Sequence, residues 1–124
     1  MILDTNALSA FADGDEALLA RLGSAELHVP VIVLGEYRYG IRRSQHRAEY
    51  ERWLCSALVA MSVLPVLEPT THHYAAICHN LRTAGTPIPT NDAWIAALAL
   101  EHGLPIVTRD QHFDLVTGLT RLGW

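Results

Sequence analysis

Lysine is absent from this sequence of 124 residues, and all nine of its basic residues are arginine. The thirteen acidic residues give a formal net charge of −4, which argues against a polycation that coats nucleic acid. An acidic excess is compatible with an enzyme whose pocket holds cations, because bound metal ions reverse the local charge balance. The lack of lysine also excludes receiver domains and P-loop proteins, since both depend on a lysine side chain.

Cysteines and long apolar runs are also scarce. The two cysteines, Cys55 and Cys78, lack CxxC spacing and lie in apolar-periodic stretches, so we expect buried thiols and no disulfide. The longest apolar runs, 29–34 and 96–100, are too short for a membrane span. The N-terminus has neither the basic flank nor the long apolar region of a secretory signal. We therefore expect a cytoplasmic protein with no membrane contact, folded as one domain over residues 1–124.

Short apolar segments alternate with stretches of helical periodicity along the chain. The expected strands are 1–4, 26–29, 63–67, 105–108 and 120–122. The expected helices are 7–12, 15–22, 31–43, 45–61, 70–83 and 91–102. Asn91 is expected to cap the last of these helices, and Met61 to belong to the buried stripe of the fourth. The alternation predicts an α/β sandwich around a mostly parallel central sheet.

Four carboxylates stand at positions where a parallel sheet would bring them together. Asp4 and Asp110 each follow a short apolar strand, and ligands bind outside the carboxyl ends of such strands. Asp92 lies in the first turn of an apolar helix, whereas Glu36 lies inside one, beside Gly35, which would let a backbone or ligand approach. Each alone has a structural explanation as a turn, cap or solvated residue. Together they offer the oxygen ligands that Mg²⁺ or Mn²⁺ prefers.

Four segments of the chain carry a resemblance to a known family. They are 1–6 (Met-Ile-Leu-Asp-Thr-Asn), 35–40 (Gly-Glu-Tyr-Arg-Tyr-Gly), 91–97 (Asn-Asp-Ala-Trp-Ile-Ala-Ala) and 108–113 (Thr-Arg-Asp-Gln-His-Phe). In this order they resemble PIN-domain nucleases and, more narrowly, the VapC toxins of bacterial toxin–antitoxin pairs. The resemblance covers essentially the whole chain and implies a three-layer α/β/α sandwich.

The resemblance also implies which residues form the site. The acidic quartet would comprise Asp4, Glu36, Asp92 and Asp110. Of these, Asp4 and Asp92 would be the foremost direct ligands of Mg²⁺ or Mn²⁺. Asn6 and Thr108 match polar positions that orient the carboxylates by hydrogen bonding.

The implied reaction is cleavage of an RNA phosphodiester by a metal-activated water, with one ion or two. Glu36 or Asp110 would orient the water or assist its deprotonation, and the products would carry a 5′-phosphate and a 3′-hydroxyl. The last acidic position varies in the family. Asp110 and Asp114, four residues further on, are therefore both candidates for it.

RNA has two sets of candidate contacts outside the carboxylates. Five of the nine arginines lie between residues 38 and 52, and guanidinium groups match phosphate geometry. The first three of them are Arg38, Arg42 and Arg43. The alternative is a solvated helix face, paired in part with Glu49 and Glu51. Tyr37, Tyr39 and Trp94 are candidates for base stacking, although such residues also serve in cores and interfaces.

The resemblance further implies a homodimer and a small cognate antitoxin, similar to VapB, whose C-terminal segment would cover the acidic pocket. A haloacid-dehalogenase-type phosphatase would also use an acidic pocket, but it needs a second aspartate two residues after the first, where this chain has Asn6. A non-catalytic PIN-like module that binds RNA or protein remains the alternative, since four carboxylates do not by themselves establish turnover.

Overall fold

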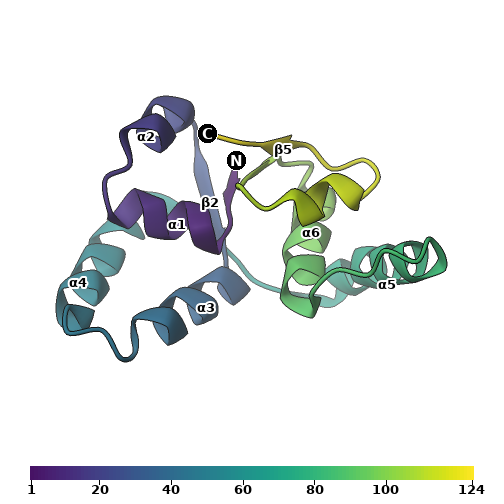
Figure 1. The fold of residues 1–124 in the computed structure, drawn as a ribbon, viewed down its shortest axis with the longest axis horizontal. Helices are drawn as coiled ribbons and strands as arrows, with labels where there is room; N and C mark the ends of the chain where they lie inside the picture. Colours follow the sequence, from purple (N-terminus) through teal and green to yellow (C-terminus); the bar gives the residue numbers. More distant parts are fainter.

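A five-stranded parallel sheet forms the centre of the structure, a computed structural model that describes residues 1–124 (Figure 1). Its strands are β1 (Ile2–Leu3), β2 (Leu27–Pro30), β3 (Met61–Leu64), β4 (Ile106–Val107) and β5 (Arg121–Leu122). They are arranged in the order β3-β2-β1-β4-β5, and every pair is parallel. The two apolar residues of β1 and of β4 are completely buried, as expected for central strands that are covered on both faces.

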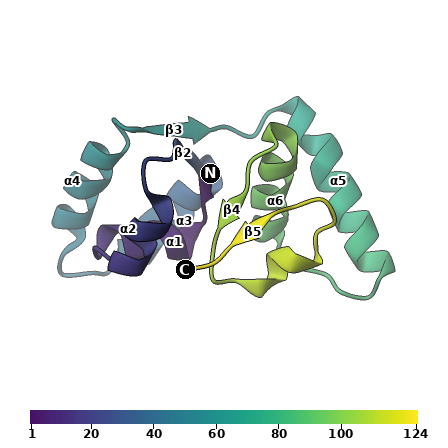
Figure 2. The same cartoon turned by 90° about the horizontal axis from the view of Figure 1, so that it is seen from above.

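Helices cover both faces of the sheet. They are α1 (Thr5–Ala12), α2 (Glu16–Leu22), α3 (Val31–Ile41), α4 (Arg47–Ala57), α5 (Glu68–Thr83) and α6 (Thr90–His102), and a short 3₁₀ helix, η1 (Gln111–Leu115), follows β4. Seen from above, α1 to α4 lie on one side of the sheet and α5 and α6 on the other (Figure 2). The predicted three-layer α/β/α sandwich with a parallel sheet is therefore confirmed. No helix is both long enough and apolar enough to cross a membrane.

The sequence predicted most helices and strands to within a few residues, but the prediction for the segment around Met61 was wrong. The fourth helix ends at Ala57, and Met61 begins β3, where it pairs with Leu27 of β2. Strand pairing in the sheet thus overrides the helical periodicity that runs through this residue. The predicted strand 63–67 also extends too far, because β3 ends immediately before Pro65, which has no N–H to donate to a ladder.

Two smaller expectations were also wrong. Asn91 does not cap α6, which begins one residue earlier at Thr90; the Asn91 side chain instead bonds to Glu36. Cys55 is exposed and Cys78 partly buried, because the helices that carry them each present a face to solvent. The space beside Gly35 is open, since a Cβ built there would meet nothing within 4 Å; no other backbone lies there, and approach by a ligand stays a prediction.

Candidate active site

Asp4 lies where β1 ends and α1 begins, and the fold gives each of its carboxylate oxygens a partner. The Oδ1 atom accepts a hydrogen bond from the backbone N–H of Ala7 at 2.9 Å and so caps α1. The Oδ2 atom accepts from Asn6 Nδ2 at 2.7 Å and from Thr108 Oγ1 at 2.6 Å. Only 5% of the residue is exposed. Asp4 is therefore a nearly buried carboxylate in a fixed orientation.

Thr108 connects the ends of β1 and β4, which are neighbours in the sheet. It is completely buried, and its hydroxyl donates to Asp4 while accepting from the backbone N–H of Asp110 at 2.8 Å. Asn6 Nδ2 also approaches this hydroxyl at 3.2 Å, and Asn6 Oδ1 accepts from the backbone N–H of Arg109 at 3.1 Å. Residues about a hundred positions apart thus form one network that orients Asp4.

Glu36 is held by side chains from two other helices. Its Oε2 atom accepts a short hydrogen bond from Thr5 Oγ1, and its Oε1 atom accepts from Asn91 Nδ2 at 2.9 Å. Neither partner was predicted from the sequence. A signal was present, because Thr5 follows Asp4 and Asn91 precedes Asp92 in two of the four segments that carry the family resemblance. These contacts connect α1, α3 and α6 at the edge where the carboxylates gather.

Asp92, Asp110 and His112 form the tightest group of potential metal ligands. One ligand atom from each residue lies within 4.8 Å of the others. His112 Nδ1 is 3.2 Å from Asp110 Oδ1 and 3.5 Å from Asp92 Oδ2. His112 was not predicted from the sequence, although it lies two residues after Asp110 in another of those four segments.

The structure distinguishes Asp110 from Asp114. Asp114 points to Arg121, whose Nε donates to its Oδ1 at 2.7 Å, and this contact holds the pKa of Asp114 below its usual value. Asp110 faces Asp92 and His112 instead. Of the two positions that the sequence left open, Asp110 is the one that joins the acidic group.

The pKa values reflect the crowding of negative charge. Burial raises the pKa of Asp4 to about 6, and the charges of Asp110 and Asp92 contribute to the rise, against hydrogen bonds that lower it. Burial also raises the pKa of Asp92; Asp110 and Glu36 add to that effect and His112 opposes it. Each of these two carboxylates is therefore influenced by others from distant parts of the chain. A cation bound among them would offset this repulsion.

The predicted RNA-contact residues fall into two groups. Arg38 lies 3.4 Å from Glu51 Oε2, as the solvated-face alternative expected. Arg42 and Arg43 are exposed and, with the exposed Tyr39, line a surface pocket. Those three side chains are accessible to a ligand.

The other two aromatic candidates pack against aromatic side chains of the protein itself. Tyr37 is only 3% exposed and lies 6.1 Å from Trp53, measured between ring centroids. Trp94 stacks on Tyr74, with ring centroids 3.7 Å apart. Core packing therefore accounts for Tyr37, as the alternative interpretation held, whereas Trp94 is partly exposed and its proposed role in base stacking stays a prediction.

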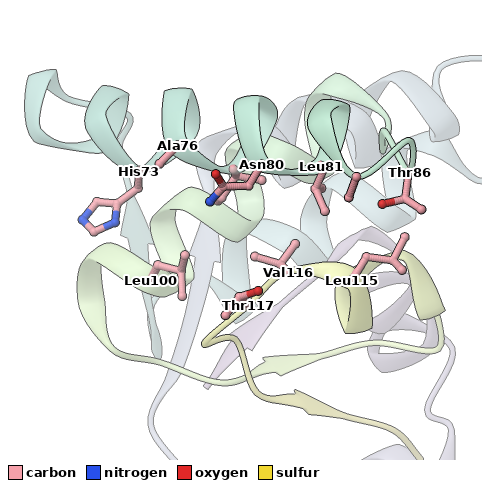
Figure 3. A pocket seen from close by; sticks show the side chains of 11 residues that line it. His73, Ala76, Asn80, Leu81, Thr86, Leu100, Leu115, Val116 and Thr117 are labelled. Atoms are coloured by element: carbon pink, nitrogen blue, oxygen red, sulfur yellow. The ribbon is translucent and has the colours of Figure 1, made fainter.

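Of two of the cavities between the helices, only one adjoins the carboxylates. The first, of about 180 Å³, lies between α5, α6 and the segment that ends η1, and apolar residues such as Leu81, Leu100 and Val116 line it (Figure 3). It contains no carboxylate. The second, of about 320 Å³, lies between α1 and α3 and is lined by Glu36, Thr5 and several hydroxyl groups. The second cavity thus extends directly from the acidic group.

Comparison with known proteins gives a consistent result. Residues 1–119 match the PIN domain family. The chain is 33% identical to ribonuclease VapC4 of Mycobacterium tuberculosis over 95 residues, which is 75% of this chain and 73% of the relative. The fold matches VapBC2 from Rickettsia felis, solved with a promoter DNA fragment, with a TM-score of 0.90 at 22% identity over 99% of this chain and 97% of that one. It also matches VapBC-5 of M. tuberculosis, described as a member of a toxin–antitoxin family, with a TM-score of 0.75 at 26% identity over 98% and 94%.

Proposed function

The chain belongs to the PIN-domain family and, within it, to the VapC group, and we propose that it is a metal-dependent endoribonuclease that acts as the toxin of a toxin–antitoxin pair. One observation carries this proposal. Carboxylates from the ends of β1 and β4, from α3 and from the first turn of α6 converge at one edge of the sheet, where burial raises the pKa values of Asp4 and Asp92 and the neighbouring carboxylates add to the rise. A protein gains no stability from such repulsion, so a ligand is the simplest reason to maintain it.

The donor set fits Mg²⁺ or Mn²⁺. Both ions prefer carboxylate oxygens and retain waters, and the acidic group combines a nearly buried carboxylate, Asp4, with the more open Asp92 and Asp110. We propose that these three and Glu36 hold the ion. When bound, a divalent ion activates a water for attack on phosphorus and offsets charge on the leaving oxygen.

The protein's own residues supply orientation. Asn6 and Thr108 hold Asp4 through its Oδ2 atom, and Thr5 and Asn91 hold Glu36 through both of its oxygens. A carboxylate fixed in this way can direct the lone pair of a water toward phosphorus without reorganising during the reaction. Loss of such partners of ligating side chains typically costs about 10–100-fold in metal affinity or activity.

A cavity and two exposed arginines offer a candidate path for an RNA strand. The cavity of about 320 Å³ between α1 and α3 is lined by both Glu36 and Ser44, and Ser44 is close in sequence to the exposed Arg42 and Arg43. We propose that an unpaired strand lies along this path, with phosphates on the arginines, and is cut to leave a 5′-phosphate and a 3′-hydroxyl. Single strands are favoured because their bases and bent phosphates are accessible to side chains.

The proposed partners are a second copy of the chain and a small antitoxin similar to VapB. An inhibitor that places Arg or Lys near Asp4 and Asp92 would offset the same repulsion as a metal ion. Size-exclusion chromatography with light scattering should report a dimer. A monomer at high concentration, with no small cognate protein co-purifying from the native host, would contradict this part of the proposal.

The central test is an RNA-cleavage assay with antitoxin-free protein. Cleavage should require Mg²⁺ or Mn²⁺, stop with EDTA and be lost in Asp4→Asn. Asp114→Asn is the matched control, because it removes an aspartate that faces Arg121 and lies outside the acidic group. Full cleavage in EDTA would overturn the metal mechanism. Equal cleavage by Asp4→Asn and wild type would show that a contaminating nuclease cuts the RNA, and would favour a non-catalytic role for this chain.

A further inference from the structure

We propose that His112 is a direct metal ligand, whose Nδ1 atom joins Asp92 and Asp110 around the ion and makes the site favour Mn²⁺ over Mg²⁺. This inference rests on the proposed function, since it presumes a divalent ion at the acidic group. It adds a nitrogen donor to a site otherwise composed of carboxylate oxygens.

The distances fit shared coordination. Two ligand atoms that each lie about 2.1 Å from one ion are roughly 3 Å apart at a right angle and about 4.2 Å apart on opposite sides. His112 Nδ1 lies 3.2 Å from Asp110 Oδ1 and 3.5 Å from Asp92 Oδ2, and the whole group spans no more than 4.8 Å. An ion can therefore contact all three atoms after only small side-chain rotations.

The backbone holds the imidazole at this place. The backbone N–H of His112 donates to Asp110 Oδ1 at 2.9 Å, which caps η1 and positions the ring beside that carboxylate. Asp110 is itself tied to the buried Thr108, and the following residue, Phe113, is completely buried and anchors η1 in the core. Half of the His112 side chain is exposed, so water and substrate can reach the same ion.

The donor type determines the metal preference. Mg²⁺ binds almost exclusively to oxygen, whereas imidazole nitrogen suits transition metals, and Mn²⁺ tolerates mixed oxygen and nitrogen sets. A nitrogen ligand therefore contributes more to Mn²⁺ affinity than to Mg²⁺ affinity. A histidine that only offset the negative charge of Asp92 and Asp110 would give no such difference, because both ions carry the same charge.

The test is pulsed electron paramagnetic resonance of protein loaded with Mn²⁺ alone. Wild type should show ¹⁴N modulation from a directly bound imidazole, replaced by the ¹⁵N pattern when histidine is ¹⁵N-labelled. The signal should vanish in His112→Gln and persist in His72→Gln, a matched control whose exposed imidazole lies beside Glu68 on α5. Titration should show Mn²⁺ affinity falling at least about tenfold in His112→Gln, with Mg²⁺ affinity changing much less.

Each contrary outcome is distinct. If wild type binds Mn²⁺ without nitrogen modulation, ligation by His112 is overturned. If Asp92→Asn then fails to bind Mn²⁺, the proposed nuclease site stays intact. Nitrogen modulation that survives in His112→Gln, or equal losses of Mn²⁺ and Mg²⁺ affinity, would also overturn it. If wild type binds neither ion, the metal site of the proposed function fails together with this inference.

Discussion

Replacing Asp92 with asparagine distinguishes between two roles for this residue: ligand of a metal ion, or acidic residue that only stabilises the start of a helix. The substitution keeps the shape of the side chain but removes a partly buried charge from the first turn of α6. Burial and the charges of Asp110 and Glu36 disfavour that charge, as the raised pKa of Asp92 indicates. Each unit of raised pKa corresponds to about 1.4 kcal/mol, whereas losing an acidic residue near a helix N-terminus costs about 0.3–1 kcal/mol.

The two effects oppose each other, and solvent screening reduces both. We therefore expect Asp92→Asn to be as stable as wild type in EDTA, or up to about 1 kcal/mol more stable, which for a domain of this size is roughly 4 °C in Tm. Mg²⁺ at a hundred times its Kd should stabilise wild type by about 2.7 kcal/mol, or roughly 10 °C. The variant should gain clearly less, because it lacks one ligand.

Thermal melts near pH 7, with EDTA and with Mg²⁺, measure both quantities. Asp114→Asn is the control: it gives up its charged contact with Arg121 but should retain the full shift with Mg²⁺. An Asp92→Asn protein that is destabilised in EDTA and shifted by Mg²⁺ as much as wild type would show that Asp92 serves only the helix. RNA cleavage by this variant at the wild-type rate would lead to the same conclusion.

Three further predictions concern pH, Thr108 and the arginines. The pKa of Asp4 rises from 3.8 to about 6 on folding, so between these values the folded state binds more protons than the unfolded state. The free energy of unfolding in EDTA should therefore fall as pH rises from about 4 to about 6. Thermal melts at several pH values in this range check this, and a Tm that rises with pH would refute it. Thr108→Val removes the hydroxyl that Asp4 and the Asp110 amide share, and should weaken Mg²⁺ binding by about tenfold in calorimetry; unchanged affinity would show that Asp4 needs no such partner. The double variant Arg42→Gln/Arg43→Gln should bind RNA more weakly than wild type. The slope of log affinity against log salt concentration should become shallower by about 0.7 for each phosphate that these arginines neutralise. An unchanged slope would show that the RNA binds elsewhere on the protein.

The central strands and the acidic residues at their ends could be predicted from the sequence because both depend on local pattern. The short apolar segments before Asp4 and Asp110 predict strands, and parallel pairing of Leu3 with Val107 brings their ends together. The partners of Glu36 could not be predicted this way. Thr5 and Asn91 meet it only after three helices have packed, and sequence periodicity contains no information about which side chains face one another across helices.

The error at Asn91 has the same origin. An asparagine at a helix start satisfies the usual capping pattern, so the sequence alone predicts that its side chain bonds to a backbone N–H of the first helical turn. In the fold, α6 begins at Thr90 with no side-chain cap, and Asn91 Nδ2 donates to Glu36 across the site. A residue that departs from its local role in order to contact a carboxylate is a sign of a functional site, visible only when both elements are placed.

Asp4 and Asp110 show that the structural and functional interpretations of a carboxylate need not compete. Each follows a strand, and each uses its Oδ1 atom to cap the helix that comes next. Capping fixes the carboxylate at the carboxyl edge of the sheet and leaves its second oxygen directed by the surroundings, toward Thr108 and Asn6 in the case of Asp4. The turn that positions the residue thereby also orients a ligand atom. Local stability therefore explains where these two aspartates lie, whereas the repulsion between the carboxylates, which adds to burial in raising the pKa of Asp4, is what the proposed cation would offset.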